Sequence, residues 1–294
     1  MLPLLIVVGG ATASGKTALA IAVARHFGTD IVSADSRQFY REMRIGNARP
    51  GPAELAAAPH HFIADRSIVR PLSAGTYAEE AGVRLEAIFA ARPVAVLCGG
   101  SGLYLRAVCE GLDEFPPVSA DADARVRELH ATGGLPALQA ELARLDPGYY
   151  ARVDRNNGRR LERALRVCYT SGRAYSSFLG QQPARSFACL YLQPAVARPD
   201  LYARIDSRVD RMLIEGLEAE ARALIAFQEL PVMQTVGYQE WWPHFAGAYD
   251  RERAVGLIKR NSRRYAKRQA TWFREYAAVK DLREVLSLIP AAYL

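Results

Sequence analysis

GATASGKT, residues 10–17, decides the fold class of this chain, because it matches the phosphate-loop pattern G-x-x-x-x-G-K-[ST] in the setting that the pattern requires. An apolar run of strand character, LLIVV, precedes it at residues 4–8, and the helix-like TALAIAVARHF follows it. The backbone N–H groups of such a loop and the N-terminus of the following helix attract a phosphate chain. The residues expected to bind a diphosphate are Gly10, Ala11, Thr12, Ala13, Ser14, Gly15, Lys16 and Thr17.

The last two residues of the loop supply chemistry, but they do not specify ATP. Lys16 adds a mobile positive charge, and the Thr17 hydroxyl is placed to ligate Mg²⁺. An ATPase would usually offer a second apolar strand that ends in Asp, whereas VAVLC at 94–98 runs into GGSGLY at 99–104. Small residues and one hydroxyl at a strand end suit close approach of a substrate, with a purely structural glycine turn as the alternative. The missing Asp counts against a motor or switch ATPase.

The rest of the chain predicts an α/β fold, a P-loop NTPase-like parallel sheet flanked by helices. Strand and helix patterns alternate at 30–34, 77–91, 94–98 and 188–192. Residues 115–184 combine helical patterning with Gly-Gly and Pro-Gly breaks and show no convincing strand. We therefore expect an all-helical insertion domain at 115–184, within a catalytic core formed by 1–114 and 185–294.

A carboxylate follows the second predicted strand. Asp35 stands at the carboxyl end of that strand, where open α/β sheets bind their ligands. Near a diphosphate and its metal it could act as a general base or orient Mg²⁺. The alternative is a helix N-cap. The polar side chains of Ser36, Arg37 and Gln38 favour a binding edge over a simple cap.

The stretch 259–274, KRNSRRYAKRQATWFR, carries seven basic side chains and no acidic one, in a chain whose formal net charge is +7. On a helical wheel these cations cover one half, and Tyr265, Trp272, Phe273 and Tyr276 lie on the other. The pattern predicts an amphipathic helix with an aromatic packed face and a cationic free face. A solvated charge face normally mixes signs, and a membrane would make poorer use of the aromatics. We expect contact with RNA.

Seven motifs occur in order and carry a family resemblance. They are GATASGKT (10–17), DSRQFY (35–40), IGNARP (45–50), HHF (60–62), GGSGLY (99–104), QTVGYQE (234–240) and AKRQATWFR (266–274). Each is weak alone, but the ordered set resembles the bacterial tRNA dimethylallyltransferase (tRNA isopentenyltransferase) family. Ala11 stands where the family often has Pro, and Arg159 where it often has Gln.

The resemblance implies transfer of a dimethylallyl group from dimethylallyl diphosphate to N6 of the adenine just 3′ of the tRNA anticodon, with Mg²⁺ as cofactor. Asp35 resembles the general base, and Ser101 stands where the family commonly has Thr. Lys16 and Thr17 resemble the diphosphate and magnesium contacts, and Arg208 an arginine that faces the diphosphate. The residues expected to contact tRNA are Asp35, Ser36, Arg37, Gln38, Arg159, Arg160, Leu161, Glu162, Arg163, Gln234, Gly237, Tyr238, Arg264, Lys267 and Arg268.

Three rival functions share parts of this pattern. A kinase of nucleosides or small metabolites would use the loop and a strand-end Asp but has no need of the cationic stretch. An adenylate prenyltransferase would accept free AMP, and a nucleotide-responsive RNA-binding protein would not need Lys16, Asp35 and a hydroxyl at 101. Four scattered cysteines without a CxxC pair suggest reduced thiols in the cytoplasm.

Other local patterns are read as structural. His60-His61 lacks the spacing and partners of a metal site, so polar contacts near substrate are expected. Trp241-Trp242 is expected to pack in the core. The N-terminal LPLLIVVGG is too short for a membrane span and reads as a strand. We expect a monomer without membrane association, although the sequence leaves the oligomeric state open.

Overall fold

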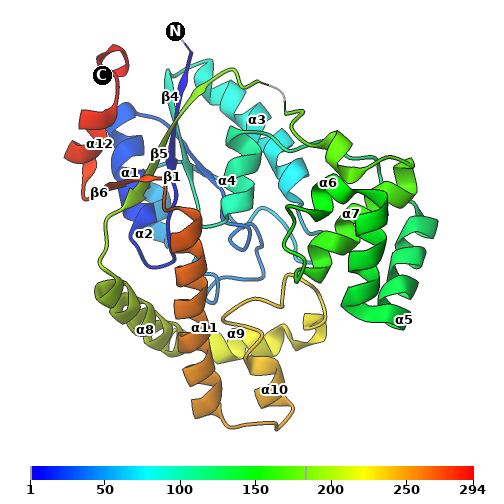
Figure 1. Cartoon of the computed structure of the whole chain (residues 1–294). Helices are drawn as coiled ribbons and strands as arrows, with labels where there is room; N and C mark the ends of the chain where they lie inside the picture. Colours follow the sequence, from blue (N-terminus) through cyan, green and yellow to red (C-terminus); the bar gives the residue numbers. More distant parts are fainter. Residues whose placement is uncertain (1, 183) are drawn as a thin grey trace. The chain divides into compact units, whose positions relative to one another are not determined.

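A six-stranded parallel sheet organises most of the chain (Figure 1). The structure, a computed structural model, describes residues 2–182 and 184–294. The strand order is β3-β2-β4-β1-β5-β6. The strand bounds are β1 Leu4–Val8, β2 Ile31–Ser33, β3 His60–His61, β4 Val94–Cys98, β5 Ala188–Pro194 and β6 Ala277–Val279. The predicted parallel α/β sheet is thus confirmed.

The register of the sheet brings the carboxyl ends of the central strands together. Strand β1 pairs with β4 on one side and β5 on the other, so Val8 lies between Cys98 and Leu192. Strand β2 pairs with β4, with Ser33 opposite Cys98. The loops that leave β1, β2 and β4 therefore begin side by side at one edge of the sheet, where ligands bind in such folds.

The sheet is buried on both faces, which explains the uninterrupted apolar run of β1. Alternate residues of a strand point to opposite faces. Leu5 and Val7 join one hydrophobic cluster, and Ile6 and Val8 join the other. Figure 1 shows α1 and α12 beside one face and α3 and α4 beside the other. Helices on both faces are what parallel sheets require.

The helices around the sheet are connected by loops of unequal length, including the long irregular segments that precede α2 and α10. Their bounds are α1 Lys16–Phe27, α2 Pro52–Ala57, α3 Ala74–Phe89, α4 Gly102–Cys109, α8 Arg198–Ile214, α9 Leu217–Ala223, α10 Trp241–Phe245, α11 Arg251–Trp272 and α12 Leu282–Leu288. Trp241 and Trp242 are buried, as their predicted role in core packing requires. No helix among the described residues is both long enough and apolar enough to cross a membrane.

A second compact unit comprises Glu110–Ala184, whereas the sheet unit comprises the residues up to Cys109 together with Arg185–Leu294. The smaller unit contains α5 Ala120–Leu145, α6 Pro147–Tyr150 and α7 Gly158–Ser171. Its own core includes Val126, Leu138 and Leu165, all fully buried. The helix α5 is interrupted at Gly134, whose φ of 60° and ψ of −155° are not helical.

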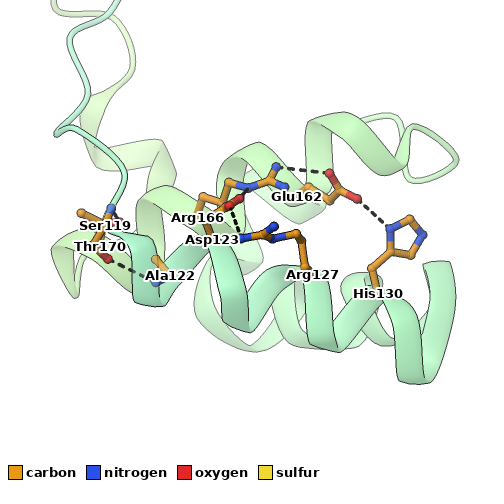
Figure 2. Close-up of polar contacts among 8 residues, drawn as sticks. All are labelled: Ser119, Ala122, Asp123, Arg127, His130, Glu162, Arg166 and Thr170. Atoms are coloured by element: carbon orange, nitrogen blue, oxygen red, sulfur yellow. Dashed lines mark hydrogen bonds and ion pairs between the residues drawn. The ribbon is translucent and has the colours of Figure 1, made fainter. Parts of the chain in front are cut away.

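Ion pairs reinforce the packing of α5 against α7 in this smaller unit (Figure 2). Arg166 of α7 donates to Asp123 of α5 at 2.7 Å and to Glu162 at 3.2 Å. The second oxygen of Glu162 lies 2.7 Å from the ring of His130 on α5. The carboxylate of Glu162 is therefore engaged on both oxygens within its own unit.

The cationic helix differs from its prediction at both ends. Helix α11 begins at Arg251, capped by the Asp250 side chain, and ends at Trp272. Phe273 and Arg274 therefore lie outside it, and the helical wheel that included them was wrong there. Trp272 was also placed wrongly on the buried face, since 44% of its surface is exposed. The two short strands β3 and β6 were not predicted, because neither has the pair of adjacent β-branched residues that marks the equally short β2.

Candidate active site

A cavity of about 740 Å³ lies at the carboxyl edge of the sheet, between the loops after β1, β2 and β4 and the helix α8. It collects most of the small-molecule site predicted from sequence. The predicted residues that line it are Thr12, Ala13, Gly15, Lys16, Thr17, Asp35, Gln38 and Arg208.

The phosphate loop has the conformation needed to present N–H groups to this cavity. Ala13 and Gly15 adopt positive φ values of 63° and 98°, and α1 begins immediately afterwards at Lys16. The first N–H groups of a helix have no acceptor within the helix. Together with the helix dipole they form an anion-binding end. A non-glycine residue at positive φ is strained, and such strain is typical of functional loops.

Two cations project into the cavity from opposite elements. The Lys16 ammonium donates to the Ala11 carbonyl oxygen at 3.1 Å, and Arg208 of α8 donates to the Thr12 hydroxyl at 3.3 Å. Burial lowers the pKa of Lys16, against the opposing effect of Cys98 and Asp35, and Arg208 lowers it further. Burial also lowers the pKa of Arg208. Poorly solvated cations favour an anionic ligand, because it would replace the lost hydration.

Asp35 is fixed by the turn that follows β2. Its Oδ1 accepts from the Arg37 N–H at 3.2 Å, and residues 36–39 form turns without starting an α-helix. The alternative assignment of Asp35 as a helix N-cap is therefore wrong. The carboxylate lines the cavity and is close enough to influence the pKa of both Lys16 and Arg208.

Ser101 ties the loop after β4 to the loop after β2. Its hydroxyl accepts from the Ser36 N–H at 2.9 Å and donates to the Ser36 hydroxyl at 3.0 Å. The two loops touch so closely that a Cβ on Gly99 would lie 2.3 Å from the Ala34 carbonyl oxygen. Ser101 is thus hydrogen-bonded to the residue that follows Asp35 in the chain. Ser101 does not line the cavity itself.

The motif at 234–240 supports the cavity wall from behind. Tyr238 is fully buried, its hydroxyl donates to Glu220 at 2.5 Å, and its ring packs on Gly46. Glu220 in turn accepts from the Ile45 and Gly46 N–H groups. Gly237 has a φ of 99° and faces the Gly46 carbonyl. These positions hold the 45–50 segment in place, and the buried Tyr238 side chain is not a surface that RNA could reach.

Gln234, from the same motif, lies elsewhere. Its amide donates to the Gln228 carbonyl oxygen at 2.6 Å and does not line the cavity. Gln38 does line it, and its amide donates to the Ala48 carbonyl oxygen at 3.1 Å. Gln38 therefore joins the Asp35 turn to the 45–50 segment.

Three further cationic residues of the cavity were not predicted from the sequence. Arg44, Arg49 and Arg211 all line it. Arg211 could have been found, because it lies three residues after Arg208 and so shares its face of α8. Arg49 sits in an irregular segment that no periodicity describes, and its Nη1 is buried without a hydrogen-bond partner among the described residues.

The cations of α11 fall into two groups. Lys259 and Arg263 are neutralised by Asp210 and Asp206 of α8, each at 2.5 Å. Arg260, Arg264, Lys267 and Arg268 are exposed, and no carboxylate pairs with them in the described part of the chain. The free positive face is therefore narrower than the sequence suggested.

The predicted RNA contacts of the smaller unit also separate. Arg159, Arg160 and Arg163 are exposed on α7. Leu161 is fully buried in the core of this unit, and Glu162 is occupied by His130 and Arg166 (Figure 2). The side chain of Leu161 therefore cannot contact RNA, since a stretch of five helical residues cannot face one side, whereas RNA contact by Glu162 stays a prediction.

Comparison with known proteins identifies the family. A model of the IPP transferase family matches residues 38–276. The chain belongs to this family. A tRNA dimethylallyltransferase from Christiangramia forsetii is 47% identical over 272 residues, which cover 92% of this chain and 90% of the relative. Another from Cytophaga hutchinsonii is 41% identical over 292 residues, covering 97% and 96%.

Solved structures of IPP transferases share the fold. The tRNA isopentenylpyrophosphate transferase of Bacillus halodurans is 31% identical with a TM-score of 0.69, covering 98% of this chain and 94% of that one. A eukaryotic dimethylallyltransferase described as acting on tRNA has a TM-score of 0.80 at 23% identity, covering 92% of this chain and 69% of that chain. Because the eukaryotic enzyme is only 23% identical, its similarity to this chain supports the fold and nothing about activity.

Proposed function

We propose that this enzyme is a tRNA dimethylallyltransferase, which moves a dimethylallyl group from dimethylallyl diphosphate to N6 of adenine 37 and releases diphosphate. The observation that carries the proposal is the cavity in which a phosphate loop, two poorly solvated cations and a strand-end carboxylate meet. The names of close relatives support the same reaction.

The phosphate loop, Lys16 and Arg208 hold the diphosphate in this scheme. Their positive charge stabilises the negative charge that grows on the leaving oxygen as the C1–O bond breaks. The Thr17 hydroxyl lines the cavity and would ligate a Mg²⁺ ion that arrives with the diphosphate, which leaves the Asp35 carboxylate free to accept a proton. Mg²⁺ usually takes one or two such ligands and completes its shell with phosphate oxygens and water. When bound, it would neutralise part of the leaving-group charge.

No larger protein cage for a metal exists in residues 2–182 and 184–294, where no cluster of three or more His, Cys, Asp or Glu side chains could hold an ion. His61 instead contacts Asp30 at 2.8 Å. These observations suit a metal that binds with its substrate better than a resident one.

Asp35 acts as the general base in this proposal. The adenine N6 lone pair is delocalised into the ring, so the amine attacks C1 best as its proton leaves. The N6–C1 bond forms, the C1–O bond breaks, and the N6 proton passes to the carboxylate. The Ser101 hydroxyl keeps the Asp35 turn in place through its hydrogen bonds to Ser36. We propose that this hydroxyl also acts as a polar group near the adenine amine.

The RNA surface that we propose combines the turn Asp35–Gln38 with the exposed cations Arg264, Lys267 and Arg268. We add Trp272, because its exposed ring packs on Gly102 and lies 6.0 Å from the Arg106 guanidinium. An exposed aromatic among cations suits stacking of an unpaired base. In the helical unit, Arg159, Arg160 and Arg163 supply a second cationic face. A cytoplasmic monomer completes the proposal.

The decisive test is mass analysis of adenosine in tRNA after incubation with dimethylallyl diphosphate and Mg²⁺. We expect a prenylated adenosine at position 37 and release of diphosphate. Asp35→Ala should slow transfer by about 10²–10⁴-fold while tRNA binding persists. Asp30→Ala, at the amino end of the same strand, is the matched control and should transfer normally. Formation of ADP from ATP would instead show a kinase. Preference for free AMP as the acceptor would show an adenylate prenyltransferase.

A further inference from the structure

Gln269 is a buried polar side chain of α11 whose amide oxygen and amide nitrogen each bond to a different loop of the active site. Only 6% of the residue is exposed. Its Oε1 accepts from the Thr12 N–H at 2.9 Å, and its Nε2 donates to the Gly100 carbonyl oxygen at 2.9 Å. One planar group therefore joins the phosphate loop to the loop after β4.

The two loops serve different groups in the proposed reaction, the diphosphate leaving group and the general base. Thr12 lies in the loop that would hold the diphosphate. Gly100 precedes Ser101, whose hydroxyl bonds to Ser36 beside Asp35. A Cβ on Gly100 would lie 2.5 Å from Gln269 Nε2 and 3.7 Å from Asp35 Oδ2, so the amide and the carboxylate converge on this glycine.

The hydrogen bond to Thr12 also shows which N–H groups of the phosphate loop are used within the protein and which are not. It occupies the N–H of Thr12, and Ser14 N–H donates to the Ala11 carbonyl oxygen at 3.3 Å. The N–H groups at the start of α1 have no acceptor within the helix and stay available for phosphate. Gln269 thus fixes the first half of the loop without competing for the anion.

We propose that Gln269 is a positioning residue, which sets the distance between the diphosphate loop and the Ser101–Asp35 pair and so aligns C1 of the prenyl group with the attacking amine. This inference rests on the proposed function. It explains why α11 has a polar residue on its packed side, where Ala266 and, just beyond the helix, Phe273 are fully buried. Reaction rates depend steeply on such alignment, since a displacement of about 1 Å can cost about 10²-fold.

The same turn of α11 carries Lys267 and Arg268 on its exposed side. RNA bound to these cations would contact the helix that holds both loops through Gln269. The proposed RNA surface and the two hydrogen bonds of Gln269 therefore belong to opposite sides of one helical turn.

The test compares Gln269→Met, which keeps the length of the side chain but removes both hydrogen bonds, with the wild-type enzyme. We expect the rate of transfer at saturating tRNA stem-loop and dimethylallyl diphosphate to fall by about 10- to 100-fold. Binding of inorganic diphosphate with Mg²⁺, measured by calorimetry, should weaken, while stem-loop affinity stays within about twofold because the exposed cations are intact. Thr271→Val, on the exposed side of the same helix, is the matched control and should behave as wild type.

Gln269→Asn keeps a neutral amide but is one methylene shorter, so we expect it to keep only one of the two hydrogen bonds and its saturated rate to lie between those of wild type and Gln269→Met. It also decides the question if the Met variant does not fold. A wild-type saturated rate and diphosphate affinity in the folded variants would overturn the inference. If the wild-type enzyme transfers no prenyl group, the proposed function fails, and the diphosphate affinity of Gln269→Met against wild type still decides the role of Gln269.

Discussion

At the scale of single residues, the cavity combines charges that are poorly solvated without their ligand. Lys16 and Arg208 both have lowered pKa values because of burial. Such a site is unstable by itself and gains when an anion enters, since the anion restores the interactions that water provided. Binding energy for the diphosphate is therefore prepared in the free protein at a cost in its stability.

Lys16→Met should therefore stabilise the ligand-free protein while it abolishes diphosphate binding. The folded-state pKa of Lys16 lies below that of the unfolded chain, so the unfolded chain holds more protons between the two values. The destabilisation is complete below the folded-state pKa and fades as pH rises from that value towards 10.5. We expect a gain on the order of 1 kcal/mol in the free energy of unfolding at pH 7, and a smaller gain at pH 10.5. Denaturant titrations at both pH values measure it, and an unstable Met variant would contradict this account.

Trp272 offers a direct optical test of the RNA surface, because the other two tryptophans, Trp241 and Trp242, are buried. Stacking of a base on its exposed ring should quench the fluorescence of the protein when a tRNA stem-loop is added. Trp272→Phe should lose the quench and keep most of the affinity, whereas Trp272→Ala should lose about 1–3 kcal/mol of binding free energy. A quench that persists in Trp272→Phe would place the RNA elsewhere.

Residues at strand ends could be predicted from the sequence, and residues in irregular segments could not. Asp35 and Ser101 follow apolar runs, so their position at the sheet edge is implied by local pattern. Arg49 reaches the cavity through a segment without periodicity. Leu161 and Tyr238 were placed on a surface because a motif was treated as one patch, whereas helix geometry and packing separate its members.

At the scale of elements, α11 joins two functions because its sides differ. Ala266, Gln269 and the adjoining Phe273 are buried, while Arg264 and Lys267 are exposed. The composition of the stretch predicted this division, but it could not show which cations the acidic residues of α8 neutralise. That information depends on tertiary contacts between helices separated by about fifty residues in the chain.

The paired cations provide a matched control for the free ones. The double variant Arg264→Gln/Arg268→Gln should weaken stem-loop binding and reduce the slope of log affinity against log salt by about 1.5, because each lost phosphate contact removes about 0.7–0.9. Lys259→Gln/Arg263→Gln removes the same formal charge but breaks pairs with Asp210 and Asp206, so its slope should change less. Equal slopes for the two double variants would remove the RNA role of the exposed face.

At the scale of the whole molecule, the sequence predicts the parallel sheet but not the order of its strands. Alternating strand and helix patterns imply crossover connections, whereas the position of β4 between β1 and β2 follows from long-range pairing. That order matters for function, because it brings the loops after β1, β2 and β4 to one cavity. The short strands β3 and β6 extend the edges and depend on pairing with strands already in place.

The separate core of the helical unit allows diphosphate binding and RNA binding to be tested independently. Leu165 is fully buried there among Val126, Leu138 and Leu142. Leu165→Ala should cost about 2–5 kcal/mol of stability, since it leaves a cavity in this core. We expect calorimetry to resolve an earlier transition for this unit, with unchanged affinity for inorganic diphosphate at temperatures below it.

Affinity for the tRNA stem-loop should fall as that earlier transition proceeds, because α7 carries Arg159, Arg160 and Arg163. The matched control is Leu85→Ala in α3, which is also nearly fully buried but belongs to the core of the sheet unit. It should lower the stability of the unit that holds the diphosphate site. If Leu165→Ala instead melts in one transition and loses diphosphate and RNA affinity together, the helical unit is not an independent RNA-binding part.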